Sequence, residues 1–322
     1  EGVAADDRQE RGLVRHVGAG AGAGGRVDRH GRALRESGRC APALAAVGLL
    51  TLAPAVDAQT LKKVADTNKI TVSYRESAVP FSYAIGPGKA VGFAADLSAA
   101  IVDDVRKTLG KSNLEVVFIP VTGQNRISLL VDGTYDLECG STTNTSARGK
   151  DVAFTINHFY TGTRVLAKKS SNIKGYADLA KKTVVATGGS TNEKVIRKYA
   201  ADNNLDLAIV LAKDYADGFR MVENDTAVAF ALDDVLLYGL AATSRDPAAY
   251  EVVGETLSVE PYACMVRKDD PEFKKLADGT IARLMKSGAF TTLYAKWFES
   301  PIPPEGVLLR MPMSEPLKAN LT

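Results

Sequence analysis

The sequence GFAADLSAAIVDDVRKTLG at residues 92–110 indicates the fold class. Its apolar residues recur at every fourth position from Phe93 to Leu109, which is the spacing of an amphipathic helix, and a glycine ends the pattern. The segments KITVSY at 69–74 and LEVVFIPV at 114–121 flank it and are rich in β-branched residues, which predicts two strands. Strand, helix and strand with short connections predict a parallel α/β unit.

The same alternation continues along the chain. Further strands are expected at 135–139, 163–169, 182–187, 207–212 and 227–232. Further helices are expected at 126–132, 190–203 and 215–224, with another beginning at Asp233 or Asp234 and a long helical region at 272–298. Two α/β units in one chain predict a ligand site in the cleft between them, next to the carboxyl ends of the strands.

The chain has 322 residues, of which 45% are hydrophobic and 24% are charged, and its formal net charge is +2. These fractions are typical of globular proteins and exclude a wholly disordered or fibrous one. The 40 basic residues are offset by 38 acidic residues spread fairly evenly along the chain, which argues against broad nucleic-acid binding. Any specificity must therefore lie in a local site.

The N-terminal residues 1–58 are expected to be a leader that the mature protein lacks. Residues 1–39 are rich in Arg and Gly, and an uncharged apolar stretch follows at 41–56. With small residues just before Gln59, this pattern predicts a secretory signal peptide over about residues 32–58 and a periplasmic protein. The apolar stretch is short for a membrane span, and the alternative is a buried helix at the start of the fold.

Two of the three cysteines, Cys139 and Cys264, lie in the expected mature chain, whereas Cys40 precedes the apolar stretch. In an oxidising compartment such a pair favours one disulfide, and the alternative is two separate buried thiols. His158 is the only histidine of the mature chain, and no C-x-x-C or H-x-x-x-H spacing occurs in it. We therefore expect no metal site.

The sequence motifs point neither to a cofactor nor to a nucleophilic enzyme. The G-x-G-x-x-G match at Gly20, Gly22 and Gly25 follows no strand and lies upstream of the signal peptide. A nucleophile needs a base beside it, and His158 is expected to be structural or on the surface. Acidic residues are plentiful, but nothing marks a pair for acid and base catalysis. We therefore expect no cofactor and no enzymatic activity.

The loop CGSTTNTSAR at 139–148 has the groups of an anion receptor. It follows a strand and is rich in hydroxyl side chains, and Thr145 can cap a short helix that carries Arg148 in its first turn. Free backbone N–H groups, hydroxyls and a guanidinium can together bind a carboxylate or a phosphate. The alternative is an ordinary capped helix with a solvated arginine.

Four other features lie at equivalent places, where a strand ends or a helix begins. They are the glycine-rich turn at 187–193, Arg75, Arg126 and Asp233. Taken singly, the glycines can serve only the turn, and each charged residue can be an ordinary surface charge. Their shared placement on the cleft side of the expected sheets makes them candidates for the ligand site.

Six segments in order along the chain carry a resemblance to a known family. They are RESAVPFSY at 75–83, QNR at 124–126, ECGSTTN at 138–144, VAFALDD at 228–234, YACMVRKDDP at 262–271 and KWF at 296–298. Across residues 61–304, the chain resembles the amino-acid-binding branch of the periplasmic solute-binding proteins, solute-binding protein family 3. The resemblance implies a type II two-lobe α/β fold, in which residues 59–162 with 257–322 form one lobe, residues 163–256 form the other, and two crossovers join them.

The resemblance also implies how an amino acid would be bound. In the family, an arginine behind a hydroxyl-rich loop binds the α-carboxylate, and here that arginine is Arg148, with Ser141 and Thr143 in the loop. An acid after a strand of the second lobe binds the α-ammonium group, and here that acid is Asp233. Thr191 would contribute from the second lobe.

By the same resemblance, Arg75 and Arg126 would bind a carboxylate in the side chain of the ligand. Three arginines against one aspartate give a pocket charge of +2, which suits a ligand of net charge −1 and leaves a neutral amino acid underneutralised. The expected ligand is therefore L-glutamate or L-aspartate.

Two positions depart from the pattern of the most similar family members. Gly123 stands where they have serine, and Tyr215 stands where they have histidine. Tyr215 is still expected in the ligand site. Both departures lie near the expected site of the side-chain carboxylate, so the preference among glutamate, aspartate and their amides stays open.

The resemblance implies the periplasmic binding component of an ABC transporter, a monomer that delivers its ligand to a membrane permease driven by an ATPase. No ATP site is visible in the sequence. One alternative is an enzyme on the same scaffold, such as a periplasmic dehydratase, which would need a general acid beside the bound carboxylate. Another is a ligand sensor that signals to a membrane receptor.

Overall fold

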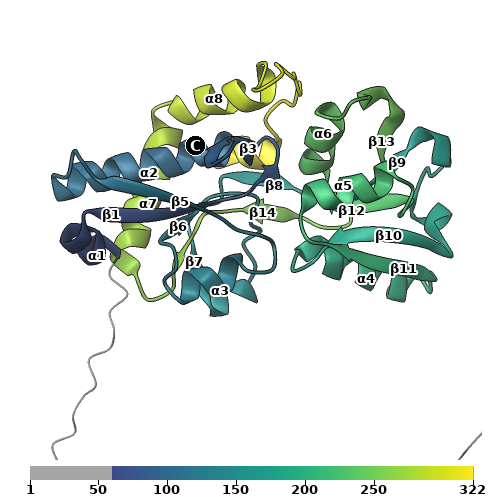
Figure 1. The fold of residues 1–322 in the computed structure, drawn as a ribbon, viewed down its shortest axis with the longest axis horizontal. Helices are drawn as coiled ribbons and strands as arrows, with labels where there is room; N and C mark the ends of the chain where they lie inside the picture. The colour runs from purple at the N-terminus through teal and green to yellow at the C-terminus, as the bar shows by residue number, and fades with distance from the viewer. Residues whose placement is uncertain (1–59, 322) are drawn as a thin grey trace, which may run out of the picture. The chain divides into compact units, whose positions relative to one another are not determined.

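The computed structural model describes residues 60–321. It is a mixed α/β protein with two lobes, which Figure 1 shows side by side, and this confirms the expected fold class. The expected leader and signal peptide at residues 1–58, with Cys40, lie outside the described residues. None of the helices in the described part is long and apolar enough to cross a membrane.

The first lobe is built on a five-stranded sheet in the order β5-β1-β6-β15-β7. Parallel strands at its centre and edge are β1 (Lys69–Tyr74), β5 (Glu115–Pro120) and β6 (Leu137–Glu138). Antiparallel to both of its neighbours, β15 (Met265–Arg267) lies between β6 and β7 (Val152–Phe154). The helices outside the second lobe are α1 (Thr60–Thr67), α2 (Phe93–Leu109), α3 (Arg126–Val131), α7 (Pro271–Lys286), α8 (Ala289–Tyr294) and α9 (Glu315–Ala319).

The second lobe repeats this plan with a sheet in the order β11-β10-β12-β9-β13. Its parallel strands are β10 (Lys182–Thr187), β11 (Leu207–Ala212) and β12 (Ala229–Asp233). Antiparallel to both of its neighbours, β9 (Thr163–Lys168) lies between β12 and β13 (Tyr250–Val253). The helices of this lobe are α4 (Thr191–Asp202), α5 (Tyr215–Glu223) and α6 (Asp234–Ala242).

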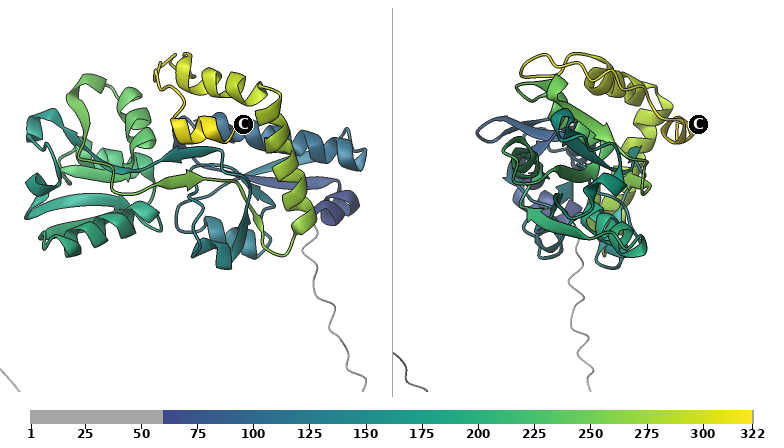
Figure 2. Two further views of the ribbon diagram at one scale, coloured as in Figure 1. Left: turned by 180° about the vertical axis from the view of Figure 1, so that it is seen from behind. Right: turned by 90° about the vertical axis from the view of Figure 1, so that its right-hand side faces the viewer.

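Two short strands run between the sheets, as Figure 1 and the left-hand view of Figure 2 show. They are β8 (Phe159–Thr161) and β14 (Glu260–Tyr262), which pair antiparallel with Thr161 opposite Glu260. The chain therefore crosses to the second lobe after β8 and returns through β14. The boundaries expected from the sequence, 162/163 and 256/257, lie in these two passages and stay a proposal.

The helix α2 shows why the opening sequence pattern was informative. Its buried face includes Phe93, Leu97, Ile101 and Val105, which are the residues at every fourth position. The helix ends at Gly110, whose φ of 65° is left-handed and whose backbone N–H bonds to carbonyls of the last turn. The sequence pattern thus correctly predicted both the buried face and the end of this helix.

An aromatic cluster next to α2 joins segments that are distant in sequence. The rings of Phe81, Phe93, Phe159 and Phe298 contact one another with centroids 4.8–6.2 Å apart. Such edge-to-face and stacked pairs add stability beyond the burial of their surface. The crossover strand β8 is thereby anchored on the first lobe.

His158 lies in the same core and is fully buried beside Phe93. Neither of its ring nitrogens has a hydrogen-bond partner among the described residues. Burial lowers the pKa of this imidazole to about 3, so it is neutral at physiological pH. His158 was expected to be either a structural or a surface residue, and its burial shows that it is structural.

Two expected elements need correction. The long helical region at 272–298 is interrupted, because Gly288 has a φ of 76° and separates α7 from α8. The expected strand at 135–139 is only the two-residue β6, since Gly140 follows and the chain turns into the hydroxyl-rich loop. The small sheet of β2 (Ser77–Ala78), β3 (Ser82–Gly86) and β4 (Lys89–Val91) was not expected from the sequence.

Candidate functional site

The first lobe brings its candidate residues together at the carboxyl ends of three parallel strands. Arg75 follows β1, Arg126 begins α3 after β5, and the hydroxyl-rich loop at 139–148 follows β6. Because these strands are adjacent and parallel, their ends meet at one edge of the sheet. The arginines are not surface charges, since Arg75 is 1% exposed and Arg126 is 2% exposed.

The second lobe positions its candidates in the same way. Thr191 begins α4 after β10, Tyr215 begins α5 after β11, and Asp233 ends β12. Each helix start follows from local sequence, because the side chains of Ser190 and Asp214 accept the backbone N–H groups of Glu193 and Asp217 as N-caps. At α4 the Glu193 carboxylate accepts the N–H of Gly189 and not that of Ser190, so Ser190 and Glu193 form only half of a capping box.

Hydrogen bonds join the two sets of residues across the lobes. The hydroxyls of Ser141 and Tyr215 share a hydrogen bond of 3.0 Å, and those of Thr143 and Thr191 share one of 3.3 Å. Arg148 donates to the Thr143 carbonyl at 2.9 Å and to the Gly189 carbonyl of the second lobe at 3.2 Å. The lobes are therefore closed on each other around these side chains.

The expected cap of Thr145 is present, since its hydroxyl accepts the backbone N–H of Arg148 at 3.2 Å. Burial and the nearby charge of Arg126 lower the pKa of the Arg148 guanidinium to about 10, which still leaves it positively charged at neutral pH. The alternative of a solvated arginine on a capped helix is wrong, because this side chain is held between the lobes.

Tyr215 contacts Arg75 with both parts of its side chain. Arg75 Nη1 donates to the Tyr215 hydroxyl at 3.3 Å, and the guanidinium carbon lies 4.5 Å from the centre of the ring. Burial acts to raise the pKa of this phenol, but the positive charges of Arg75 and Arg126 outweigh burial and lower it. The tyrosine thus occupies one of the N–H donors of Arg75.

Asp233 is buried, and each of its two carboxylate oxygens accepts a hydrogen bond from a neutral donor. One carboxylate oxygen accepts from Asn192 Nδ2 at 2.6 Å and the other from the Tyr262 hydroxyl at 2.5 Å. Burial, and after it the negative charge of Glu260, raises the pKa of Asp233 to about 7. A cation such as an ammonium group would favour its ionised form.

Two buried acids near the site were missed from the sequence, and they correct the expected pocket charge of +2. Glu138 and Glu260 are both buried, at 0% and 3% exposed. When they are counted with Asp233 and all groups are ionised, three acids balance the three arginines. The signal for Glu138 was a charged residue inside the strand sequence Leu137-Glu138-Cys139, directly before the hydroxyl-rich loop.

Several buried donors at the site have no hydrogen-bond partner among residues 60–321. They are Arg75 Nη2, Arg126 Nε and the Thr187 hydroxyl. An unpaired buried polar group costs free energy, so each of these donors is available to form a hydrogen bond with a ligand. The arginine atoms come from the end of the site where a side-chain carboxylate was expected.

Gly123 lies where the backbones of the two lobes come close to each other. A Cβ atom at Gly123 would lie 2.8 Å from the carbonyl oxygen of Gly188, and one at Gly189 would lie 2.8 Å from the carbonyl oxygen of Gly123. A Cβ at Gly188 would lie 2.4 Å from Gln124 Nε2. The departure from serine at position 123 therefore concerns contact between the lobes.

A disulfide joins Cys139 to Cys264, as expected for an oxidising compartment. Cys139 directly follows β6 and precedes the hydroxyl-rich loop, and Cys264 lies between β14 and β15. The bridge thus links the loop that carries Ser141 to the returning crossover. In the part of the chain that the structure covers, no cluster of three or more His, Cys, Asp or Glu residues could hold a metal ion.

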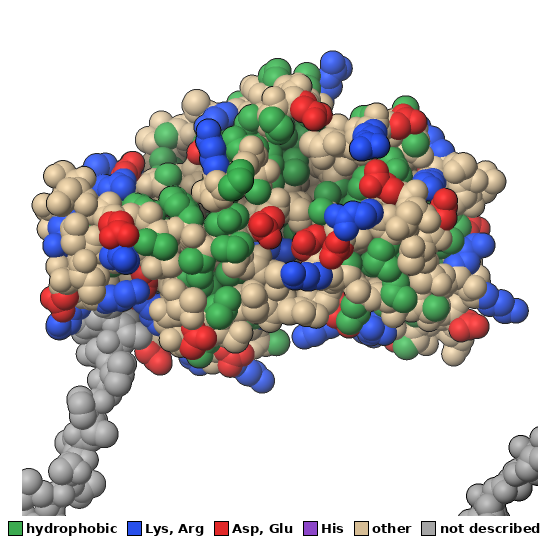
Figure 3. Space-filling model, viewed as in Figure 1, with side chains coloured by type: hydrophobic (Ala, Val, Ile, Leu, Met, Phe, Trp, Pro, Cys, Tyr) green, Lys and Arg blue, Asp and Glu red, His purple; other side chains and the backbone are tan. Residues whose placement is uncertain are grey.

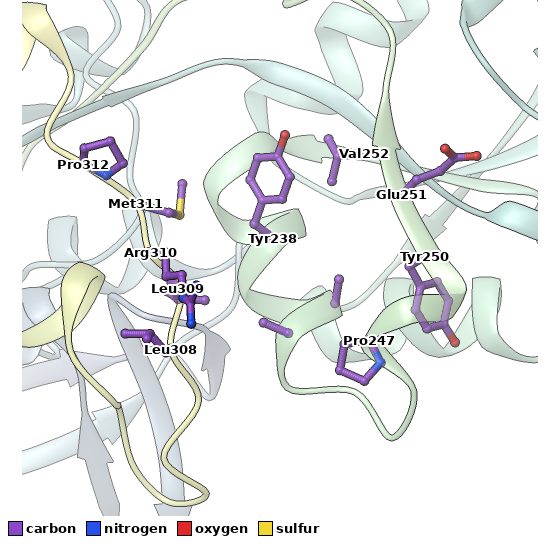
Figure 4. A pocket seen from close by; sticks show the side chains of 12 residues that line it. Tyr238, Pro247, Tyr250, Glu251, Val252, Leu308, Leu309, Arg310, Met311 and Pro312 are labelled. Carbon is purple, nitrogen blue, oxygen red and sulfur yellow. The ribbon is translucent and has the colours of Figure 1, made fainter.

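Two surface features lie apart from this site. Figure 3 shows Lys and Arg side chains interspersed with Asp and Glu over the face seen there. Figure 4 shows a groove of about 520 Å³ between α6 with β13 and the segment at 308–312, lined mainly by apolar groups such as Tyr238 and Met311. None of the eight ligand-site residues expected from the sequence lines this groove.

Comparisons with known proteins agree with the fold and show the family. The model of the bacterial extracellular solute-binding proteins, family 3, matches residues 70–300. The chain is 47% identical over 260 residues to the glutamate/aspartate import solute-binding protein of Escherichia coli K12, covering 81% of this chain and 86% of that one. It is 45% identical over 287 residues to the L-glutamate/L-aspartate-binding protein of Pseudomonas aeruginosa, covering 87% and 95%. Among solved structures, an ancestral arginine-binding protein bound to glutamine has a TM-score of 0.63 at 28% identity, covering 72% of this chain and 98% of that one.

Proposed function

Because this chain belongs to the bacterial extracellular solute-binding proteins of family 3, we propose that it binds L-glutamate or L-aspartate between its lobes and delivers it to the membrane permease of an ABC transporter. The curated relatives named above, at 45–47% identity, are glutamate/aspartate-binding proteins, and one of them is an import protein by name. The chain covers 86% and 95% of these two relatives, so the proposal concerns the activity of the binding protein as a whole.

The observation that carries this proposal is the convergence of three arginines on one closed interlobe site, of which Arg75 and Arg126 are buried and Arg148 is half-buried. Arg75 and Arg126 have unpartnered N–H groups there, and Arg148 reaches across to the second lobe. Guanidinium groups bind carboxylates with two parallel hydrogen bonds, so this site suits a ligand with more than one carboxylate. An α-amino acid with an acidic side chain meets that condition.

We assign the α-carboxylate of the ligand to Arg148, assisted by Ser141 and Thr143, with Thr191 contributing from the second lobe. Asp233 would bind the α-ammonium group, whose positive charge lowers the pKa of Asp233 from about 7 and restores its ionised form.

The side-chain carboxylate is assigned to the unpartnered N–H groups of Arg75 and Arg126. Glu138 offsets the positive charge of these two arginines only in part, and the charge that remains favours a carboxylate over an uncharged amide. Acidic selectivity therefore follows from the local charge of the distal end and not from the charge of the whole pocket.

The protein is proposed to act as a monomeric binding protein of the periplasm, exported by its N-terminal signal peptide, and not as an enzyme. Its assigned groups bind and orient the two ends of the ligand, and its relatives are transport proteins by name. Recovery of chemically unchanged glutamate after prolonged incubation, measured by chromatography, tests this against a dehydratase. Formation of any product would contradict it.

The ligand assignment is tested by thermal unfolding of residues 59–322 with each of the twenty common amino acids. A ligand at about 100 times its Kd stabilises the folded state by about 2.7 kcal/mol, which raises the Tm by several degrees. We expect the largest shifts with glutamate and aspartate. No shift with either would overturn the proposed function.

A further inference from the structure

A buried glutamate lies directly under the ligand site and has no role in the assignments above beyond its charge. Glu138 ends β6 and is 0% exposed. It faces Ser73 of β1 and Met265 of β15 in the sheet register. The hydroxyl-rich loop begins one residue later, after Cys139. This carboxylate is therefore part of the floor of the site.

Glu138 is connected to Arg126 through one hydroxyl. The Thr142 hydroxyl donates to Glu138 Oε1 at 3.0 Å, and Arg126 Nη1 donates to the same hydroxyl oxygen at 2.8 Å. Because the hydroxyl has one proton, the carboxylate that accepts it orients the oxygen lone pairs toward the guanidinium. The position of Arg126 thus depends on Glu138 through Thr142.

The carboxylate also lies close to Arg75. A Cβ atom built on Gly140 would lie 2.6 Å from Glu138 Oε1 and 3.6 Å from Arg75 Cγ. Both side chains therefore lie next to Gly140. Glu138 Oε2 is buried and has no hydrogen-bond partner in the described chain, and Arg75 Nη2 and Arg126 Nε are likewise unpartnered. The free oxygen and the free donors belong to the same end of the site.

The charged and titratable groups that face Glu138 come from four places. They are Arg126 on α3, Arg75 after β1, Arg148 after the hydroxyl-rich loop and the phenol of Tyr135 before β6. Burial raises the pKa of Glu138, and the positive charges of Arg126, Arg75 and Arg148, with the Thr142 hydrogen bond, only partly oppose it. The environment of Glu138 therefore favours protonation of this carboxylate more than water does.

We propose that Glu138 is a positioning residue and an internal counter-ion of Arg75 and Arg126, and that it takes up a proton from solvent when a ligand carboxylate reaches these arginines. This inference rests on the proposed function, because it needs an acidic ligand at the distal end. The proton binds at Oε2, the oxygen that has no partner.

The physical reason is the repulsion between two carboxylates that share one pair of arginines. Ligand binding brings a second negative charge beside Glu138 in a buried place, which favours the protonated form of one of the two groups. By linkage, proton uptake makes the affinity for an acidic ligand rise as the pH falls, by at most about tenfold per pH unit for one proton. A side-chain amide brings no charge and causes no uptake at Glu138.

The test is isothermal titration calorimetry with glutamate and aspartate in buffers of different ionisation enthalpy, from about pH 5 to 8, where buried carboxyl groups titrate. The dependence of the measured enthalpy on the buffer gives the number of protons exchanged. The chains compared are the wild type, Glu138→Gln, which keeps an acceptor for Thr142, and Glu305→Gln, a matched change at an exposed site.

We expect the wild type and Glu305→Gln to take up as much as one proton more per ligand than Glu138→Gln. Equal proton numbers in the wild type and Glu138→Gln would overturn the inference while leaving the proposed function intact. Failure of the wild type to bind either amino acid would instead overturn the proposed function, and the inference with it. If Glu138→Gln does not fold, titration of the wild type with glutamine replaces it, and equal uptake for glutamate and glutamine overturns the inference.

A separate experiment tests whether Glu138 positions Arg126 through the Thr142 hydroxyl. Thr142→Val removes the hydroxyl between Glu138 and Arg126 but leaves both charges in place. We expect weaker binding of glutamate with proton uptake retained, and recovery of the affinity in Thr142→Ser. Binding of glutamate by Thr142→Val with the wild-type affinity would overturn this part.

Discussion

The two lobes have the same sheet plan but supply opposite chemistry to the site. Both present the carboxyl ends of three parallel strands, β1, β5 and β6 in the first lobe and β10, β11 and β12 in the second. The first lobe contributes all three arginines, whereas the second contributes Asp233 and uncharged groups. Equivalent topology thus fixes where site residues lie, and the residues at the strand ends decide what each lobe binds.

This difference assigns separate tasks to the lobes. The expected ligand has two carboxylates and one ammonium group, and every arginine proposed to bind the carboxylates comes from the first lobe. The second lobe adds Thr191 and Tyr215 and closes the site through hydrogen bonds to Thr143 and Ser141. We therefore expect changes in the first lobe to abolish affinity and changes at the lobe contact to reduce it.

The largest effect is expected for Arg148→Ala, which removes the proposed partner of the α-carboxylate. The ligand would keep a buried carboxylate without its charged partner, and affinity for glutamate should fall about 100-fold or more. Calorimetry measures the change. Arg220→Ala, at an exposed arginine of the second lobe, is the matched control and should bind glutamate normally. A loss below tenfold for Arg148→Ala would remove it from the site.

A smaller and selective effect is expected for Arg126→Ala. Loss of one charged partner of the side-chain carboxylate should weaken glutamate binding by about 2 kcal/mol, or ~30-fold, and should weaken glutamine binding far less. Both ligands are titrated into the same preparation of the variant. Equal losses for glutamate and glutamine would place Arg126 away from the side-chain carboxylate.

The acid of the second lobe gives a pH-dependent prediction. In the free protein the pKa of Asp233 is about 7, and a bound ammonium group favours the ionised carboxylate, so binding releases a proton from this residue. The affinity advantage of the wild type over Asp233→Asn should therefore shrink as the pH falls below about 7, by at most about tenfold per pH unit. Kd values for both chains across this range measure it, and a constant ratio would contradict the assignment.

The smallest effect is expected at the lobe contact, for Gly123→Ala. The new Cβ would meet the Gly188 carbonyl at 2.8 Å, so closure must shift the backbone and the affinity should fall several-fold while the unliganded lobes remain folded. Gly279→Ala, inside α7 with no atom within 4 Å of the added carbon, controls for the general effect of replacing glycine. Unchanged affinity in Gly123→Ala would show that this contact does not limit closure.

The site could be located from the sequence because its position depends on the order and the direction of the strands. Arg75, Arg126 and Asp233 each lie at a strand end or helix start, and parallel pairing of adjacent strands brings such positions to one edge. This step needs only the type and direction of each element. Apolar periodicity gave the type of the elements, as the buried face of α2 shows, and the alternation of strands and helices gave the parallel direction of the strands.

The parts that sequence missed depend on which groups come close in three dimensions. A count of charges cannot tell that Glu138 and Glu260 are buried beside the arginines while most other acids are exposed, so the pocket charge was overestimated. The steric reason for Gly123 likewise appears only when the second lobe lies against it. The break at Gly288 was missed because one glycine within an apolar helical pattern is compatible with a continuous helix.

The bridge between Cys139 and Cys264 determines where the molecule can bend. It fixes the returning strand to the floor of the site only two residues after Tyr262, whose hydroxyl bonds to Asp233. We therefore expect the second lobe to rotate through the backbone between the disulfide and the second sheet, around β8, β14 and their links to β9 and β13. We expect opening to move Thr191, Tyr215 and Asp233 away from the first lobe, while the disulfide keeps the loop that carries Ser141 in place for the next ligand.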